Sequence, residues 1–126
     1  MNADNKAKPD NKVKVGIFGQ QVAENFLRDK GMAMVAANFR APGGEIDLIM
    51  KDDDYIVFVE VKYRRGTEYG LPGESVGARK QRRIKDAALY YVARYPGQDQ
   101  DFRFDTVEIL DVRQGLLVNH IENAFW

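Results

Sequence analysis

The sequence predicts a single α/β domain in which a mixed β-sheet is flanked by helices. Two segments carry apolar residues at spacings of three and four, the pattern of amphipathic helices. The remaining apolar runs are short, rich in Val, Ile and Phe, and bounded by turn residues, as strands are. The 126 residues are enough for one hydrophobic core and too few for two. The expected order of elements is α-β-β-β-α-β-β.

The first helix is expected over residues 15–30 and ends at Gly31. Its apolar stripe consists of Val15, Phe18, Val22, Ala23, Phe26 and Leu27. Residues 1–14 are polar and rich in lysine, which predicts a disordered N-terminal arm and leaves residues 15–126 as the folded domain. A strand over residues 32–39 follows.

A β-hairpin is expected next, after a turn at residues 41–44, whose sequence is Ala-Pro-Gly-Gly. Its strands are residues 45–50 and 55–62, and the acidic loop 51–54 joins them. This hairpin forms the centre of the predicted sheet.

The second half of the chain predicts a loop, a helix and two more strands. Gly and Pro residues mark 63–75 as a loop, and a helix is expected over residues 76–94, before Pro96-Gly97. The apolar stripe of this helix consists of Ile84, Ala87, Ala88, Tyr91, Val92 and Tyr95. Residues 102–110 and 116–121 are the last two strands.

Composition narrows the class of protein. The chain has no cysteine, so disulfides, thiolate metal sites and a thiol nucleophile are excluded. It lacks an apolar run of about 18 residues and a secretory leader, so a cytoplasmic protein without membrane contact is expected. His120 has no companion residues for a metal site or a catalytic triad, and we expect it to be structural.

The formal net charge is zero, yet the basic residues are unevenly placed. They gather in one part of the chain, as Lys62, Arg64, Arg65, Arg79, Lys80, Arg82, Arg83 and Lys85. This local excess favours a nucleic-acid-binding surface, although a solvated charged surface has the same appearance.

The residues that point to chemistry lie on the hairpin. Because side chains alternate along a strand, Glu60 and Lys62 project from one face of residues 55–62. On residues 45–50 the same alternation puts Ile46, Leu48 and Met50 on one face and Glu45, Asp47 and Ile49 on the other. A turn centred on Asp53-Asp54 would set Asp47 opposite Glu60, whereas a turn one residue earlier would set it opposite Phe58. In either register the Asp47 and Glu60 carboxylates lie within reach of one ion.

Two adjacent carboxylates repel each other, so one pKa should rise unless a cation lies between them. Mg²⁺ or Mn²⁺ suits this position, since Mg²⁺ commonly binds through one or two carboxylates together with substrate phosphate. Lys62 would orient or deprotonate an attacking water, or stabilise charge on the phosphate. The alternative is an ion-paired strand end, in which Lys62 neutralises Glu60 and Asp47 is solvated.

The second helix adds a further set of candidates. Extending its core stripe towards the N-terminus reaches Gln81, which would either hydrogen-bond a site group or a substrate phosphate, or be a boundary residue at the helix end. The surrounding cations, Arg79, Lys80, Arg82 and Arg83, oppose the helix dipole, and phosphate binding would explain their position.

The hairpin residues resemble the YraN family, bacterial proteins of uncertain function. The resemblance rests on the paired motif of residues 43–49, Gly-Gly-Glu-Ile-Asp-Leu-Ile, and residues 57–62, Val-Phe-Val-Glu-Val-Lys. It extends to Asn38-Phe39-Arg40, Lys80 through Ile84, Arg103-Phe104-Asp105 and Ile121 through Phe125. That family is assigned to the PD-(D/E)XK nuclease superfamily and is similar in its core to archaeal Holliday-junction resolvases.

The resemblance implies a restriction-endonuclease-like fold and a set of site residues. Asp47 and Glu60 match the acidic metal ligands, the Val61 carbonyl a third ligand, and Lys62 the motif lysine. Gln81 matches a polar helix residue that supports such sites. The implied activity is Mg²⁺- or Mn²⁺-dependent endonuclease cleavage of phosphodiester bonds, in DNA more than RNA, on branched or single-stranded structures. A homodimer would be expected for a four-way junction.

One position departs from the family pattern. The first helix of the family usually reads Gly-x-x-Gly-Glu, with the glutamate as a further acidic site residue, whereas residues 16–20 here are Gly-Ile-Phe-Gly-Gln. Gln20 keeps an oxygen ligand but loses the charge, and Glu24 lies one turn further along the same helix face. The departure favours a one-metal mechanism. It also keeps open an alternative function, a weakly active or inactive nucleic-acid-binding module that acts with a partner protein.

Overall fold

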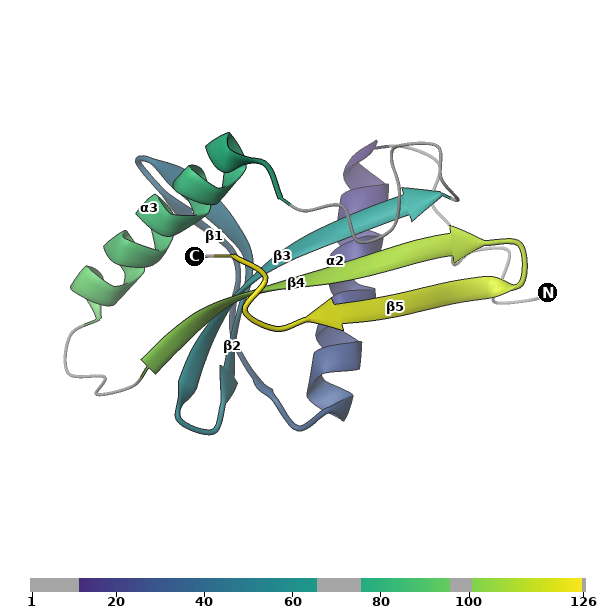
Figure 1. The fold of residues 1–126 in the computed structure, drawn as a ribbon, viewed down its shortest axis with the longest axis horizontal. Coiled ribbons are helices and arrows are strands. Elements are labelled where there is room, and N and C mark those ends of the chain that lie inside the picture. The colour runs from purple at the N-terminus through teal and green to yellow at the C-terminus, as the bar shows by residue number, and fades with distance from the viewer. Residues whose placement is uncertain (1–11, 66–75, 96–100, 126) are drawn as a thin grey trace.

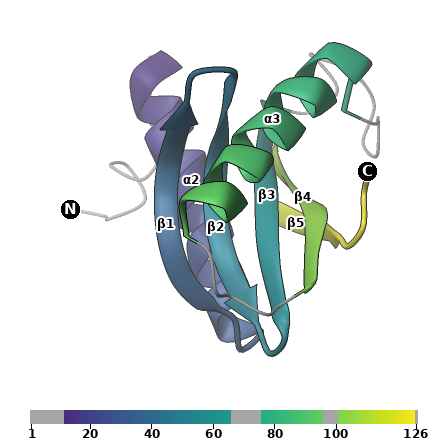
Figure 2. The same ribbon diagram turned by 90° about the vertical axis from the view of Figure 1, so that its left-hand side faces the viewer.

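The computed structural model describes residues 12–65, 76–95 and 101–125 and shows a five-stranded mixed sheet with a helix on each face. The two helices cover opposite faces of the sheet (Figures 1 and 2). The predicted fold class and the order α-β-β-β-α-β-β are confirmed. Within these residues, neither helix is long and apolar enough to cross a lipid bilayer.

The elements are α2 (Lys12–Asp29), β1 (Ala33–Ala41), β2 (Gly44–Asp52), β3 (Tyr55–Arg65), α3 (Ala78–Arg94), β4 (Asp101–Val112) and β5 (Gly115–Ile121). Most boundaries differ from the predictions by one to three residues, and two of these differences are the largest. Residues 12–14 are helical instead of belonging to the N-terminal arm, and residues 1–11 lie outside the described part. Residues 63–65 continue β3 instead of opening the following loop, whose residues 66–75 also lie outside it.

The strands lie in the order β1-β2-β3-β4-β5, with β3 and β4 parallel and the other pairs antiparallel. Parallel neighbours need a crossover connection, and the segment that contains α3 supplies it. In the parallel pair Glu60 lies beside Thr106, and Lys62 lies beside Glu108. The sheet therefore carries polar side chains at its centre.

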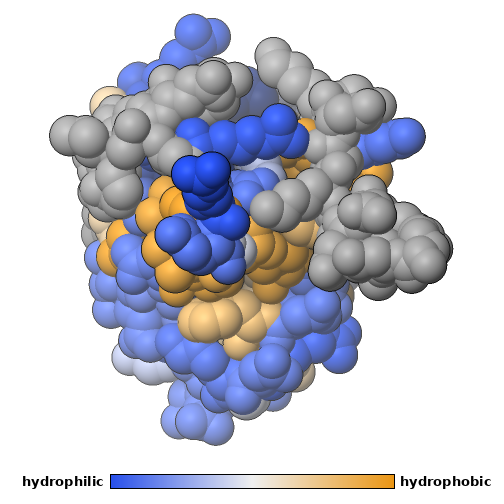
Figure 3. Space-filling view, turned by 90° about the vertical axis from the view of Figure 1, so that its right-hand side faces the viewer, coloured by the Kyte–Doolittle hydropathy of each residue, from blue (hydrophilic) through white to orange (hydrophobic). Residues whose placement is uncertain are grey.

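Two hydrophobic layers hold the helices to the sheet. The layer under α3 is made by Ile46, Ile49, Ile56, Phe58, Val76, Ile84, Ala87, Ala88, Tyr91 and Phe104. The layer under α2 is made by Ala23, Leu27, Met32, Leu48, Met50, Val57, Val59, Val107 and Ile109. Seen from the end at which β3 and β4 finish, hydrophobic side chains gather in the middle of the face, bordered by hydrophilic ones (Figure 3).

The apolar stripe of α3 is shorter than predicted. Ile84, Ala87, Ala88 and Tyr91 are buried, but Val92 is 37% exposed and Tyr95 is 47% exposed. The helix ends at Arg94, so its last turn is only partly covered by the sheet.

The predicted alternation of β2 is wrong at one point. Ile46, Leu48 and Met50 were expected on one face, but Ile46 packs under α3 while Leu48 and Met50 pack under α2. The pleat is therefore interrupted at Asp47. On the neighbouring strand β1, Asn38 takes a left-handed conformation with φ of 52°, so the backbone is irregular on both strands here.

The start of β2 lies against the first turns of α3. A Cβ atom on Gly44 would lie 2.0 Å from the carbonyl oxygen of Arg83, which is far inside van der Waals contact. Only glycine allows this approach of helix to strand. The contact fixes the basic turn of α3 close to the strand that carries Asp47.

Candidate metal centre

The hairpin register brings the two predicted carboxylates side by side. Asp52 pairs with Tyr55 around the Asp53-Asp54 turn, and the β2–β3 pairing continues to Leu48 and Val59. The first of the two predicted registers is therefore the one that forms. The next position along the two strands sets Asp47 against Glu60, where the regular pairing stops.

Asp47 occupies the gap that opens where β2 leaves β3. Its Oδ2 accepts a hydrogen bond of 2.9 Å from the backbone N–H of Val61. Its Oδ1 lies 3.5 Å from Nε2 of Gln20 on α2, and the same Gln20 amide donates to Oδ1 of Asn38 at 2.8 Å. The Asp47 carboxylate thus takes the place of a backbone acceptor on β2, and it also contacts α2 through Gln20.

Glu60 projects towards α3 and is 3% exposed. Burial, followed by the charge of Asp47, raises its pKa from 4.5 to about 7, although Lys80 acts in the opposite direction. Its Oε2 is buried and accepts no hydrogen bond of regular geometry. The predicted rise in the pKa of one carboxylate is thus found at Glu60, because burial and Asp47 outweigh the effect of Lys80.

Lys80 is a site residue that the sequence indicated only as a phosphate-binding cation. Its Nζ lies 2.5 Å from Oε2 of Glu60, which is an ion-pair distance. Burial lowers the pKa of Lys80, but its hydrogen bond to Glu60 and the charges of Glu60, Asp47 and Glu45 outweigh this, so the net shift is upward. The ammonium is therefore held in its charged form by the carboxylates.

A pocket of about 210 Å³ lies next to Asp47 and Lys80, between α2, β2, β3 and α3. It is lined by Val15, Gly16, Gly19, Gln20, Asp47, Val61, Tyr63 and Lys80. A Cβ on Gly19 would only touch Tyr63, at 3.4 Å, so this part of α2 lies directly against β3. The pocket is where a small cation or a phosphate group would reach Asp47.

The other predicted site residues lie in different surroundings. Lys62 is half-buried on the same face as Glu60, beside the buried Glu108 of β4. Gln81 donates its side-chain amide to the Val76 carbonyl at 2.7 Å, so this amide supports the start of its own helix. Glu24 forms an ion pair of 2.8 Å with Arg28 on α2, whereas Gln20 is the α2 residue that touches Asp47.

The predicted nucleic-acid-binding residues divide by exposure. Arg79, Arg82 and Arg83 on α3 are exposed, as is Arg65 at the end of β3. Arg64 is only 8% exposed, and its predicted contact with a nucleic-acid backbone stays a prediction. The basic surface therefore lies on α3, next to Lys80.

The residues present fit a divalent cation with few protein ligands. In the described part of the chain, no cluster of three or more His, Asp or Glu side chains is arranged to hold a metal ion. Asp47 and Glu60 would supply two carboxylate oxygens, and the Val61 carbonyl would supply a third, with water or phosphate as the remainder. Mg²⁺ is commonly bound in this way.

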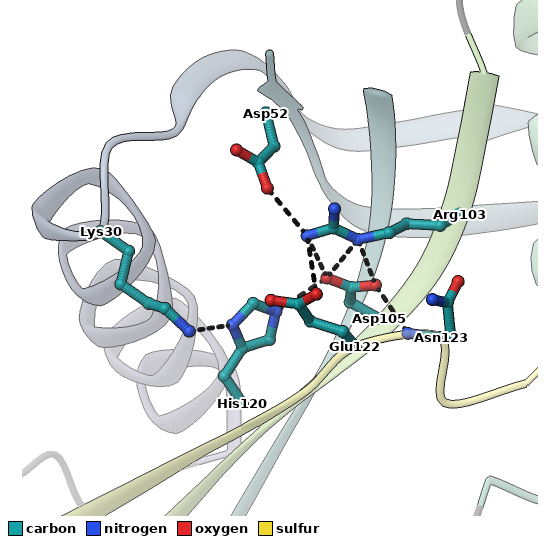
Figure 4. Close-up of polar contacts among 7 residues, drawn as sticks. All are labelled: Lys30, Asp52, Arg103, Asp105, His120, Glu122 and Asn123. Atoms are coloured by element: carbon teal, nitrogen blue, oxygen red, sulfur yellow. Dashed lines mark hydrogen bonds and ion pairs between the residues drawn. The ribbon is translucent and has the colours of Figure 1, made fainter. Parts of the chain in front are cut away.

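A second polar cluster lies around Asp105 and ties the C-terminal segment to the sheet (Figure 4). Arg103 donates to the fully buried Asp105 at 3.0 Å, and His120 lies 2.7 Å from the same carboxylate. Burial raises the pKa of Asp105, but the hydrogen bonds from His120, Arg103 and the Asn123 backbone outweigh it and lower the pKa overall. Lys30 reaches the other ring nitrogen of His120, so α2, β4 and β5 meet here.

The Asp105 cluster gives the outer motifs of the sequence a structural role. The backbone N–H of Ala124 donates to the Phe104 carbonyl, and the rings of Phe104 and Phe125 pack 5.3 Å apart. The expected structural role of His120 agrees with its burial in the cluster. The sequence does not show that these residues belong together, because their contacts join segments that are far apart in the chain.

Comparisons with known proteins identify the family. A family model described as an uncharacterised protein family, UPF0102, matches residues 19–109. The chain belongs to the UPF0102 family. UPF0102 is the YraN family that the hairpin motif indicated, and it lies in the PD-(D/E)XK nuclease-like superfamily. The match includes Gln20, Asp47, Glu60 and Lys80 and ends within β4.

The chain is also similar to named members of UPF0102 over nearly their whole length. A UPF0102 protein of Symbiobacterium thermophilum is 47% identical over 113 residues, which is 89% of this chain and 96% of the relative. One from Caldicellulosiruptor bescii is 46% identical over 114 residues, 88% and 96% of the two chains. One from Clostridioides difficile is 41% identical over 110 residues, 87% and 95% of the two chains.

The raised pKa of Glu60 predicts how stability depends on pH when metals are chelated. A carboxyl whose pKa rises on folding stabilises the fold below its unfolded pKa of 4.5, and this contribution is lost as pH rises through about 7. Relative to Glu60→Gln, the parent's free energy of unfolding should fall by on the order of 3 kcal/mol between pH 4 and pH 8. Urea unfolding in EDTA measures this difference. Parallel pH profiles for the two proteins would contradict the buried, proton-holding Glu60.

Proposed function

We propose that this UPF0102 protein is a metal-dependent endonuclease that hydrolyses phosphodiester bonds in DNA. The observation that carries the proposal is the buried Glu60 carboxylate, which lies beside Asp47 and has an oxygen without a hydrogen bond of regular geometry. A pair of carboxylates in this position is costly unless a cation binds it. The pocket at Asp47 leaves room for such an ion and for phosphate oxygens.

Asp47, Glu60 and the Val61 carbonyl would hold Mg²⁺ or Mn²⁺. A divalent cation bound there would lower the pKa of a coordinated water and neutralise charge on the phosphate. Lys62, on the same face as Glu60, would orient the water or stabilise the developing charge. Asp47 is held in place by the Val61 N–H and by Gln20, so its carboxylate needs little reorganisation to act.

The reaction is a hydrolysis. The oxygen of water forms a bond to phosphorus, the bond from phosphorus to the leaving sugar oxygen breaks, and the water gives up one proton while the leaving oxygen gains one. Arg79, Arg82 and Arg83, which are exposed on the first turns of α3, would bind the flanking phosphates. Single-stranded or branched DNA is the substrate class that the family resemblance implies.

Substitution of the two carboxylates tests the endonuclease. We expect Asp47→Asn and Glu60→Gln each to reduce Mg²⁺- or Mn²⁺-dependent cleavage by more than about a hundredfold, since a metal ligand is lost while the side-chain shape is kept. The matched control is Asp54→Asn, in the exposed turn of the same hairpin, which should cleave like the parent. The assay uses four-way junctions, single-stranded DNA, duplex DNA and single-stranded RNA. A parent that cleaves none of them, or an Asp47→Asn variant as active as the parent, would contradict the proposal.

A second candidate function is a nucleic-acid-binding module with weak or no turnover, and Gln20 favours it. Gln20 brings a neutral amide to Asp47 at the position where the family usually has a glutamate. The site would then bind a metal ion too weakly for efficient cleavage. Such a module would bind DNA through α3 and lose that affinity at high salt.

Restoring the carboxylate distinguishes the two functions. We expect Gln20→Glu to tighten Mn²⁺ binding by roughly tenfold, because it adds a negative charge next to Asp47. Gln21→Glu adds the same charge at the next position. This position is exposed, so the charge is screened and should change the affinity less than about twofold. Calorimetric titration measures both variants. Equal effects would show that Gln20 does not belong to the site, and cleavage gained only by Gln20→Glu would favour the module.

A further inference from the structure

We propose that Lys80 is an internal counter-ion of the Asp47–Glu60 pair, which a divalent cation must displace, so that this lysine sets the metal affinity of the site. The inference rests on the proposed metal site and adds a regulating residue to it. Lys80 lies on the first turn of α3, outside the hairpin that carries the carboxylates.

Lys80 already occupies one position that a metal ion on Glu60 would take. Nζ of Lys80 lies 2.5 Å from Oε2 of Glu60. A divalent cation on the same oxygen would lie about 2.0–2.6 Å from it, so the ammonium and the metal would be two adjacent cations. Two cations this close repel each other strongly in a buried site. Glu60 can therefore keep one of them on this oxygen but not both.

A divalent cation would also balance the charge of the two carboxylates better than the Lys80 ammonium does. When both are ionised, Asp47 and Glu60 carry two negative charges, and the ammonium of Lys80 balances one of them. A divalent cation in place of the ammonium makes the charges equal. Among the described residues that line the pocket at Asp47, Lys80 is also the one with a basic side chain. The exchange therefore replaces an incomplete neutralisation with a complete one.

The Lys80 side chain has room to leave the site. The Lys80 side chain is 62% exposed, whereas Glu60, its partner, is 3% exposed. The flexible stem of lysine can swing the ammonium into solvent without disturbing the packing of the helix. Metal entry would then need a change of rotamer and no movement of the backbone.

The surface outside the site favours the inward position. Lys80 also borders an open groove of about 420 Å³ with Gly77, Arg79 and Arg83. An ammonium turned outwards would meet these two arginines and be repelled, unless a phosphate lay between them. Substrate phosphate would therefore help to release Lys80 and favour metal binding.

Calorimetric titration of the full chain with Mn²⁺ tests the inference. We expect Lys80→Met to tighten Mn²⁺ binding by roughly tenfold, because removing a charge at this distance changes the affinity of the carboxylates by at least one order of magnitude. Lys80→Arg keeps the positive charge and should bind Mn²⁺ like the parent. Arg94→Met removes an equal charge from an exposed position at the other end of the same helix and tests whether net charge alone accounts for the effect; it should change the Mn²⁺ affinity less than twofold.

The possible results separate this inference from the proposed function. If the parent binds Mn²⁺ and Lys80→Met binds it equally or more weakly, Lys80 does not compete with the metal and the inference is overturned. An equal gain in Arg94→Met also overturns it. If neither the parent nor any variant binds Mn²⁺, the metal site itself is refuted. Circular dichroism confirms folding, and Lys80→Gln replaces Lys80→Met should the latter misfold.

Discussion

The site depends on the point at which β2 stops pairing with β3. A regular antiparallel ladder would satisfy the Val61 N–H with a backbone carbonyl, but the pleat of β2 is interrupted at Asp47, and a side-chain carboxylate accepts this hydrogen bond instead. The interruption turns Asp47 towards the end of the ladder, next to Glu60. Both carboxylates are fixed by the backbone of the sheet, and neither depends on a loop.

The electrostatics of the site follow from that geometry. Burial and Asp47 together make ionisation of Glu60 costly, and Lys80, a partly exposed lysine from another element, acts against them. Gln20 adds a neutral contact where a third carboxylate would have increased the repulsion. The Asp105 cluster shows the contrast, since Arg103, His120 and the Asn123 backbone together satisfy that buried carboxylate. Asp105 therefore stabilises the fold, whereas Glu60, whose Oε2 accepts no hydrogen bond of regular geometry, suits a ligand.

The sequence predicted the order of elements and the adjacency of Asp47 and Glu60, because apolar periodicity and hairpin geometry are local properties. It could not choose between two hairpin registers, and it placed Ile46 on the same face as Leu48, because strict alternation does not anticipate an interrupted pleat. It also left Lys80 among the phosphate-binding cations. That position follows from the close approach of Gly44 to α3, a tertiary contact that no periodicity in the sequence reveals.

The most direct measurement of the central claim is a crystal structure of the parent protein soaked in Mn²⁺, with anomalous scattering used to locate the ion. The account predicts one manganese peak within about 2.0–2.6 Å of carboxylate oxygens of both Asp47 and Glu60. The same map should show Nζ of Lys80 withdrawn from Glu60. A peak that contacts neither carboxylate, or no peak beside an unchanged Lys80–Glu60 ion pair, would contradict it.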